Sequence, residues 1–325
     1  MKQITLFFTI IISCSIANAA IITVDNKVPC VGQYKTLKEG HDAANNGDTI
    51  YVCPSEAFYV GITVNKKLII IGTGHSRPGE RLSTTLISGR MQFDEGADGS
   101  ALKGFGGYFS VIINANDTTI QKNRIKDITV NDNHKGTAIL QNYIYNTSNS
   151  SDFKVVLIQN ENEVFIANNV FNTTPGYTIF APSPTITISI FHNILKAKHR
   201  SFDLSNSNIY VANNIIISGT VYYSSNNFYN NMSYNSQLPK GNGNLTNIDM
   251  ATVFIDPTND FHLLEDSPAK DAGTDGVDMG IYGGSTPYID DGRTSLPSIV
   301  KFKTDYSASH ESGLEIEIQA VSNNQ

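Results

Sequence analysis

The sequence contains no tryptophan, and charged residues make up only 16% of its 325 residues, against about 25% in an average soluble domain. Asn, Ser, Thr and Gly take the place of the missing charge. This composition is typical of strands and turns and argues against long charged helices. The hydrophobic content of 40% is enough for a packed core, which excludes a disordered chain.

Basic residues are scarce as well. The 23 Lys and Arg are outnumbered by 30 Asp and Glu, for a net charge of −7. Binding to nucleic acid requires clustered Lys and Arg to neutralise phosphates. The composition therefore argues against a nucleic-acid partner, and it weakens the case for a polyanionic substrate.

Long apolar runs are absent after the N-terminus. Lys2 precedes the run ITLFFTIIISCSI, which is shorter than the ~20 residues of a membrane-spanning helix, and ANA follows as a small-residue cleavage site. These features predict a signal peptide over 1–19, cut near Ala19. IISC at 11–14 also resembles a bacterial lipobox, so a lipoprotein anchored at Cys14 is the alternative. Both readings predict a secreted, extracellular or cell-surface protein with no transmembrane helix.

Only three cysteines are present. Cys14 is removed with the signal peptide or lipidated, which leaves Cys30 and Cys53. An even pair in an oxidising compartment predicts a disulfide between them. Two cysteines without a nearby His pair do not predict a metal site.

One short helix is predicted near the start, over 37–45. Thr36 is suited to be its N-cap, and Glu39 three residues later completes a capping box. Asn46-Gly47 supplies the stop. Short strands separated by Gly, Asn, Asp and Pro are predicted to follow.

The central region repeats a motif of the form apolar-x-x-Asn-x-apolar. It occurs as IQKNRI, ILQNYI, IANNVF, IFHNIL, VANNII and YSSNNF, whose central residues are Asn123, Asn142, Asn169, Asn193, Asn214 and Asn226. The first four spacings, 19, 27, 24 and 21 residues, match single coils of a solenoid. The last, 12 residues, is shorter than a coil and indicates a different corner of one.

A coiled parallel sheet explains why Asn recurs between apolar residues. The flanking apolar side chains point inward and stack on those of the next coil. An Asn at the bend tolerates the left-handed conformation. Its buried amide is satisfied by the Asn of the next coil. The repeats therefore predict an asparagine ladder, which is a structural device.

The last part of the chain divides into three segments. Residues 256–284 are rich in Asp-Gly, Ser-Pro and Gly-Gly turns, which predicts the last coil and a closing loop. Residues 285–299 are linker-like, and LEIEIQAV at 314–321 alternates as a strand. We therefore expect one domain over 20–284, a linker and β tail over 285–325, and a monomer.

Two segments resemble a known family. YKTLKEGHDAANNGDTIYVCPSEAFYVGITVNKKLIIIGTG at 34–74 resembles the N-terminal cap of secreted bacterial proteins of the pectate-lyase-like superfamily. DFHLLEDSPAKDAGTDGVDMGIYGG at 260–284 resembles their closing motif. The resemblance covers 21–284 and implies an all-β fold, a right-handed parallel β-helix (pectin lyase fold). It implies no particular activity, because this fold carries lyases, hydrolases, epimerases and non-enzymes.

Two basic clusters are the candidates for contacting an acidic sugar. They are Lys122, Arg124 and Lys126 in QKNRIKD, and Lys198, His199 and Arg200 in KAKHRSFD. Residues two apart on a strand share a face, so the first three are expected to point outward together. A solvated outer face is the alternative for each cluster.

Motifs of known enzymes of this fold are missing. The Arg-x-Pro-x-x-Arg pattern of pectate lyases and the Asp-Pro-His-Asp signature of alginate epimerases do not occur. Acidic runs at 94–99 and 271–278 could hold Ca²⁺, but neither has a specific spacing, so no cofactor or metal is predicted. We expect a glycan-contacting protein, with a polysaccharide lyase or glycoside hydrolase as the alternative. Its partner is a polysaccharide or cell-surface glycan.

Overall fold

A computed structural model of the chain describes residues 19–75, 84–174, 176–204, 208–224, 227–294, 298–304 and 316–321. The predicted signal peptide lies outside these residues except for Ala19, and so do Cys14 and Asn226. Within the described residues, no helix has the length and apolar composition needed to cross a membrane.

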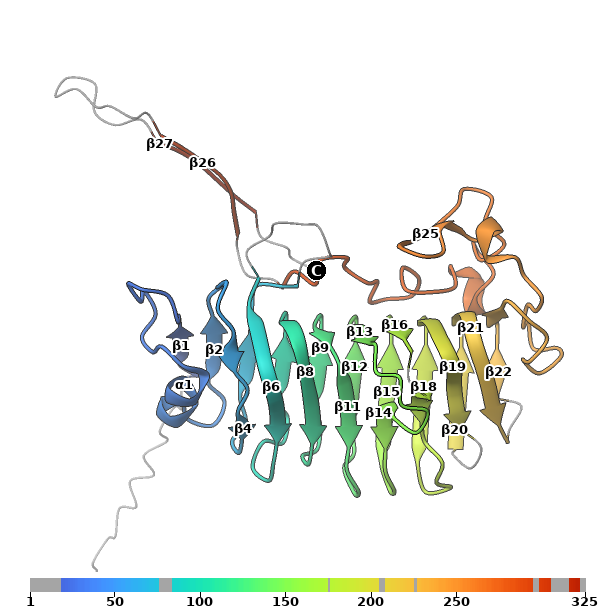
Figure 1. The fold of residues 1–325 in the computed structure, drawn as a ribbon, viewed down its shortest axis with the longest axis horizontal. Helices are drawn as coiled ribbons and strands as arrows, with labels where there is room; N and C mark the ends of the chain where they lie inside the picture. The colour runs from blue at the N-terminus through green and yellow to red at the C-terminus, as the bar shows by residue number, and fades with distance from the viewer. Residues whose placement is uncertain are drawn as a thin grey trace, which may run out of the picture.

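The strands form a parallel β-helix, as the repeats predicted (Figure 1). One side of every coil belongs to a ten-stranded sheet, which we call sheet A. Its strands, in their order along the helix, are β1 (Ile21–Val24), β2 (Thr49–Val52), β5 (Ile69–Ile71), β7 (Ala101–Lys103), β9 (Thr119–Gln121), β12 (Thr137–Leu140), β15 (Glu163–Ala167), β18 (Thr187–Phe191), β20 (Asn208–Ala212) and β22 (Phe228–Tyr229).

A thirteen-stranded sheet, sheet B, forms the rest of each coil. The strands that directly follow the Asn corner are β10 (Arg124–Ile125), β13 (Tyr143–Asn146), β16 (Val170–Thr173), β19 (Ile194–Leu204), β21 (Ile215–Tyr223) and β23 (Met232–Ser233). The others are β3 (Tyr59–Val60), β4 (Thr63–Val64), β6 (Leu86–Phe93), β8 (Gly106–Ile113), β11 (Asp127–Val130), β14 (Lys154–Ile158) and β17 (Tyr177–Phe180).

Aliphatic stacking holds the coils in register. In sheet A, Ile50 pairs with Ile70, which pairs with Leu102, and the stack continues through Ile120 and Ile139. All of these side chains are fully buried. Each buried aliphatic side chain contributes about 1.5–3 kcal/mol of transfer free energy, so the repeated stack is the main source of stability.

The short helix forms where the sequence predicted it. Helix α1 covers Leu37–Ala43, and the Thr36–Glu39 capping box is complete. The helix ends two residues earlier than predicted, because Ala44 is already extended. Lys66 Nζ satisfies the last carbonyls by donating to His41 O at 3.0 Å and Ala44 O at 2.9 Å. The helix lies over the first strands of sheet A (Figure 1).

The asparagine ladder is also present, and its amides are bonded as predicted. Asn142, for example, donates to Asn169 Oδ1 from both its backbone N (2.8 Å) and its Nδ2 (3.0 Å), while Nδ2 also donates to Ile120 O (2.8 Å). We call the whole set the inward ladder. It consists of Asn123, Asn142, Asn169, Asn193, Asn214, Asn231 and Asn244.

Two details of the ladder differ from the prediction. It continues at Asn231 and Asn244 in the last coils. The left-handed residue is not the ladder Asn but the residue before it, at φ between 48° and 61°. These residues point out of the coil, and we call them the outward column. They are Lys122, Gln141, Asn168, His192, Asn213 and Asn230.

A shorter amide ladder stabilises another corner of the coils. Gln159 Nε2 donates to Asn131 Oδ1 at 2.9 Å, and Asn131 Nδ2 donates to Asn114 Oδ1 at 2.5 Å. Asn114 Nδ2 then donates to Asp94 Oδ1 at 2.6 Å. Each residue directly follows a strand of sheet B, so this ladder marks the carboxyl ends of β14, β11, β8 and β6.

The segment after the last coil forms small elements. The 3₁₀ turn η1 (Met250–Thr252) leads into an antiparallel hairpin of β24 (Phe254–Asp256) and β25 (Asp260–Leu263), and η2 (Thr274–Gly276) follows. Strands β26 (Ser298–Thr304) and β27 (Ile316–Val321) pair as a second antiparallel hairpin. The predicted C-terminal strand is therefore part of a hairpin.

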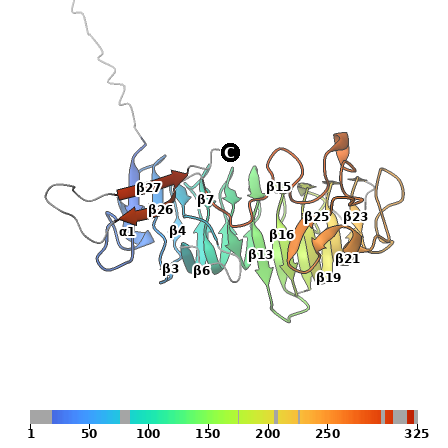
Figure 2. The same cartoon turned by 90° about the horizontal axis from the view of Figure 1, so that it is seen from above.

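Residues 272–294, which we call the return segment, run back along the Asn corner toward the first coils (Figures 1 and 2). The outward column binds the segment throughout. Asn230 Nδ2 donates to Ala272 O, Asn168 Nδ2 to Ile281 O, and Gln141 Nε2 to Thr286 O. Part of the predicted linker therefore contacts the coils, and the segment crosses the predicted domain boundary at residue 284.

Candidate functional site

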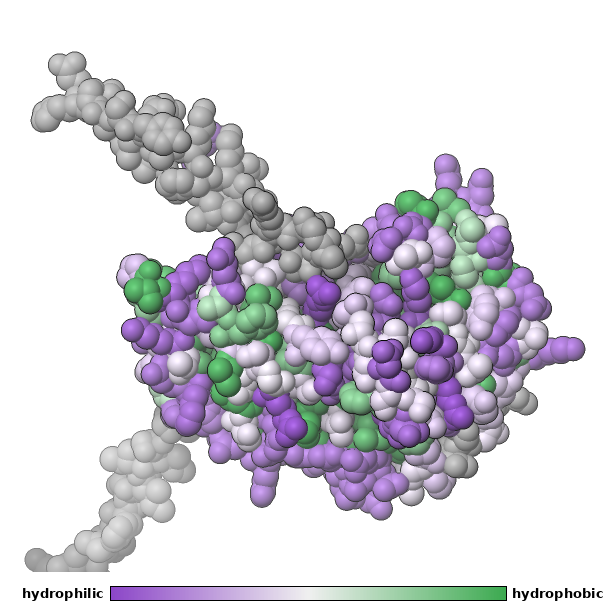
Figure 3. All heavy atoms as spheres, in the orientation of Figure 1, coloured by the Kyte–Doolittle hydropathy of each residue, from purple (hydrophilic) through white to green (hydrophobic). Residues whose placement is uncertain are grey.

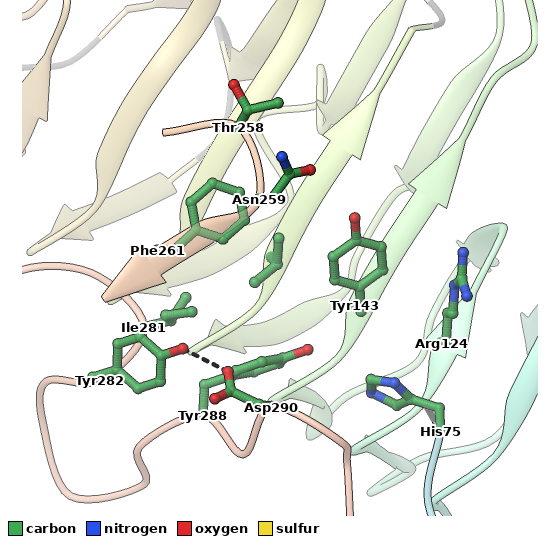
Figure 4. A pocket seen from close by; sticks show the side chains of 11 residues that line it. His75, Arg124, Tyr143, Thr258, Asn259, Phe261, Ile281, Tyr282, Tyr288 and Asp290 are labelled. Atoms are coloured by element: carbon green, nitrogen blue, oxygen red, sulfur yellow. Dashed lines mark hydrogen bonds between the residues drawn. The ribbon is translucent and has the colours of Figure 1, made fainter. Parts of the chain in front are cut away.

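A cavity of about 230 Å³ lies between sheet B and the C-terminal elements (Figure 4). Its floor comes from the first residues of β10, β13 and β16. The turn and second strand of the β24–β25 hairpin form one wall, and the return segment forms another. The lining residues are His75, Arg124, Tyr143, Val170, Thr258, Asn259, Phe261, Ile281, Tyr282, Tyr288 and Asp290.

Arg124 supplies the positive charge of the cavity. Its guanidinium carbon lies 5.7 Å from the ring centroid of Tyr143 and 5.5 Å from that of Tyr145. The two rings are stacked, and Asn172 Nδ2 donates to the Tyr143 hydroxyl at 3.2 Å. Among the described residues, no carboxylate lies within 4.0 Å of this guanidinium. Arg124 is therefore held by aromatic contacts while its donors stay available for a ligand.

The opposite wall carries the negative charge. The Tyr282 hydroxyl donates to Asp290 Oδ1 at 2.5 Å, and His262 Nε2 lies 3.7 Å from Asp290 Oδ2. His262 also contacts Asp260 Oδ1 through Nδ1 at 2.7 Å, and its ring stacks on Tyr282 at 4.2 Å. This network joins the β24–β25 hairpin to the return segment, so it fixes both walls relative to each other.

His75 closes the N-terminal end of the cavity. Its backbone N donates to Asp291 O at 2.7 Å, and its ring packs against Gly292. A Cβ at Gly292 would lie 2.4 Å from the His75 ring, and Gly292 also has a left-handed φ of 61°. Glycine is therefore required there for the return segment to approach the coil.

The structure separates the members of the first predicted cluster. Lys122 follows β9 of sheet A, whereas Arg124 belongs to β10 of sheet B, because Asn123 between them forms the corner. The prediction that Lys122, Arg124 and Lys126 share one strand face is therefore wrong. Burial lowers the pKa of Lys122, with Lys103 adding to the effect. Only Arg124 of the three lines the cavity.

Lys126 is used within the protein. Its Nζ lies 3.3 Å from Asp127 Oδ2 and over the rings of Tyr108 and Phe153, at 5.6 Å and 5.4 Å. These contacts hold the lysine against the surface of sheet B, which gives it a packing role.

The second predicted cluster lies on β19, outside the cavity. Arg200 is sandwiched between the rings of Tyr222 and Tyr177, at 4.2 Å and 4.8 Å, and its Nη1 donates to Asp203 Oδ2 at 2.7 Å. Lys198 and His199 are exposed. Figure 3 shows hydrophilic and hydrophobic residues interspersed over this face. Since the donors of Arg200 already have a partner, this cluster is less suited to a sugar carboxylate than Arg124.

The predicted disulfide is not formed. Cys30 and Cys53 are both half-buried free thiols. Cys30 Sγ donates to Gly32 O at 3.2 Å, and burial raises the pKa of the Cys53 thiol. An even number of cysteines in the chain does not by itself place two sulfur atoms in bonding geometry.

The two acidic runs considered for Ca²⁺ take part in hydrogen bonding within the protein. Asp94 accepts from Asn114, Asp98 accepts from the backbone N of Asn116, and Asp278 accepts from the backbone N of Asp271. In the part of the chain that the structure describes, no three His, Cys, Asp or Glu side chains are grouped to hold a metal ion.

Sequence reasoning missed most of the cavity. Tyr282, Tyr288 and Asp290 come from the return segment, and Asp290 was predicted to lie in a linker-like stretch. Tyr143 directly follows the ladder Asn142, just as Arg124 directly follows the ladder Asn123. The positions that directly follow a ladder Asn begin the cavity floor, and this is the sequence signal that could have indicated it.

Comparisons with protein-family models, with curated proteins and with solved structures give no match to this chain. The parallel β-helix is therefore defined by the strands and their register, and the chemistry of the site is defined by its own side chains.

Proposed function

We propose that this is a secreted or cell-surface β-helix protein of the pectate-lyase-like type that binds an extracellular glycan in the Arg124 cavity. The observation that carries the proposal is the Arg124 guanidinium, which has no carboxylate partner among the described residues and is held on two tyrosine rings at the cavity floor. An arginine held in this way is suited to bidentate pairing with a carboxylate.

The ligand that fits these walls is an acidic sugar. Its carboxylate would pair with Arg124, its hydroxyls would meet Asn259 and Asp290, and its apolar face would contact Tyr143 or Tyr288. The volume of about 230 Å³ is smaller than the ~300–1,000 Å³ of most small-molecule sites. One uronate unit of a glycan, rather than a longer segment, is therefore the expected occupant.

The experiment is calorimetric titration of the mature protein with uronate oligosaccharides. Arg124→Gln is expected to weaken binding about 10- to 100-fold, since a charged hydrogen bond contributes about 1.5–3 kcal/mol. Arg90→Gln is the matched control, because Arg90 is an exposed arginine of sheet B outside the cavity. Equal binding by both variants, or no binding of any uronate by the parent protein, would contradict the proposal.

A polysaccharide lyase is the second candidate function. A cation that neutralises a carboxylate and titratable groups across the same cavity (Tyr282, Asp290, His75) are the parts that β-elimination requires. A glycosidase is less well supported, because paired carboxylates are needed for hydrolysis and Asp290 is the one carboxylate among the described lining residues. The ultraviolet absorbance of unsaturated uronates, measured with and without Ca²⁺, tests for the lyase.

A further inference from the structure

A row of aromatic rings crosses the outer face of sheet A, on the other side of the return segment from the Arg124 cavity. The row has one ring from each of four successive strands: Phe165, Phe191, Tyr210 and Tyr229. Neighbouring centroids are 5.6, 5.4 and 5.1 Å apart. At these distances the rings are offset rather than eclipsed, so each leaves part of its face uncovered. Phe165 and Tyr210 remain 41% and 39% exposed.

The return segment forms a groove with the two middle rings of this row. Thr274, Asp275 and Val277 rise beside Phe191 and Tyr210, and together they enclose an open volume of about 570 Å³. The wall is fixed to the coil, because Thr274 donates to Asn213 Oδ1 from its backbone N (2.8 Å) and from its hydroxyl (3.1 Å). The groove is therefore built by the protein and has the size of a small-molecule site.

The charges of the groove differ from those of the cavity. No Lys or Arg is among its described lining residues, and Asp275 is its only carboxylate. His192 at its base hydrogen-bonds to Asn213 (3.1 Å), and burial lowers the pKa of His192, which keeps the ring neutral at neutral pH. A groove with one carboxylate and no cation does not suit an anionic ligand.

Polar groups at the rim are available for a ligand. The hydroxyl of Tyr210 and the carboxylate of Asp275, which both line the groove, have no hydrogen-bond partner among the described residues. Aromatic faces beside free hydroxyl and carboxylate groups match a pyranose, which has an apolar C–H face and hydroxyls at its edge.

We propose that this groove is a second glycan site, which binds neutral pyranose units by stacking on Tyr210 and its neighbours. It shares no residue with the Arg124 cavity and does not depend on the function proposed for that cavity. The two sites flank the return segment, so one glycan with acidic and neutral units could reach both.

Native gel electrophoresis through gels containing a mixed-linkage β-glucan, a galactomannan or an arabinogalactan tests the proposal with the full chain. Retardation by at least one of these neutral polysaccharides is expected. Tyr210→Ala is expected to weaken the affinity for the polysaccharide, measured from the retardation, about tenfold, because about 1.4 kcal/mol of stacking is lost. Tyr210→Phe, which keeps the ring, is expected to retain most of it.

Two controls separate the groove from other surfaces. Tyr234→Ala removes a comparably exposed tyrosine outside the groove and is expected to leave the retardation unchanged. Arg124→Gln is expected to weaken uronate binding while the binding of neutral polysaccharides persists, so the two sites can fail separately. Equal retardation of Tyr210→Ala and the parent protein overturns the proposal. So does retardation by no neutral polysaccharide, or a groove that instead binds tetramethylammonium, which would make it a site for cations.

Discussion

Two sets of side chains run along the same corner of the β-helix, one residue apart in the sequence, and they do different work. Asn169 belongs to the inward ladder, is fully buried and bonds to Asn193 and Ile139. Asn168 belongs to the outward column and bonds to Ile281 and Gly283 of the return segment. The side chains are identical, but the left-handed φ of 54° at Asn168 turns it out of the coil. Backbone conformation therefore determines which amide stabilises the stacking of the coils and which one holds the return segment beside the cavity.

The largest effect is expected from breaking the inward ladder. Asn169→Ala removes the acceptor of the Asn142 backbone N and of one Nδ2 hydrogen of Asn142, and it removes a donor to the carbonyl of Ile139. Each buried unsatisfied group costs about 1–3 kcal/mol, so the free energy of unfolding should fall by about 3 kcal/mol or more. Guanidinium chloride unfolding measures it, and a loss below about 1 kcal/mol would show that water replaces the ladder bonds.

The outward neighbour should behave differently. Asn168→Gly removes the amide without straining the left-handed backbone, and we expect unfolding free energy to fall by only about 1 kcal/mol. The return segment should loosen instead, which limited proteolysis within 272–294 and weaker uronate binding would detect. If both Asn variants lost the same stability and the proteolysis pattern did not change, the division between the two columns would be wrong.

His192 makes the outward column sensitive to pH. Burial holds its folded pKa below the usual value of 6.5, so the unfolded chain binds the proton first as the pH falls. The contribution of neutral His192 to the free energy of unfolding is therefore fully present above about pH 6.5. It is lost as the pH falls through that value toward the folded pKa. His192→Asn, the residue found at Asn168 and Asn213, should remove this part of the pH dependence in thermal melts. An unchanged slope between parent and variant would assign the dependence to other groups.

The smallest expected effect is a gain. Lys122 occupies the left-handed position at φ 58°, where Asn is tolerated better than Lys. Lys122→Asn should raise the free energy of unfolding by about 0.5–1 kcal/mol, seen as a higher melting temperature. Uronate affinity should stay the same, because Lys122 does not line the cavity. A clear loss of uronate affinity would show that Lys122 takes part in binding.

The coils could be predicted because each one repeats a short sequence motif. Each apolar-x-x-Asn-x-apolar motif fixes one corner, and stacking of identical residues fixes the next. The last coils were assigned less well. FYNNMS at 228–233 resembles VANNII but ends in Ser233 in place of the last apolar residue, so the repeat was not recognised there, although its Asn231 continues the ladder. The left-handed residue was misplaced by one, because the pattern marks the corner but not the φ angles on either side of it.

The cavity could be predicted only in part. Arg124 was predicted as a binding residue from the basic cluster around it. Asp290 and Tyr282 are brought to the cavity by the path of the return segment, and this segment does not follow the repeat of the coils. Several outward-column bonds to that segment join residues more than 100 positions apart, such as Asn168 and Gly283. Contacts of this range depend on where a loop crosses the finished coils, and a local pattern carries no information about that.

The position of the return segment at the end of the chain means that the Arg124 cavity is completed only after the coils have been synthesised. Thr294 Oγ1 donates to Gly72 O across 222 positions, so the first coils can stack one by one as they emerge, while the cavity has only its floor. Both walls that face Arg124 come from residues made after the last coil. Ligand binding at this cavity would therefore report that translation has passed the whole β-helix, and a chain halted before residue 281 would lack the wall that Tyr282, Tyr288 and Asp290 give to the Arg124 cavity.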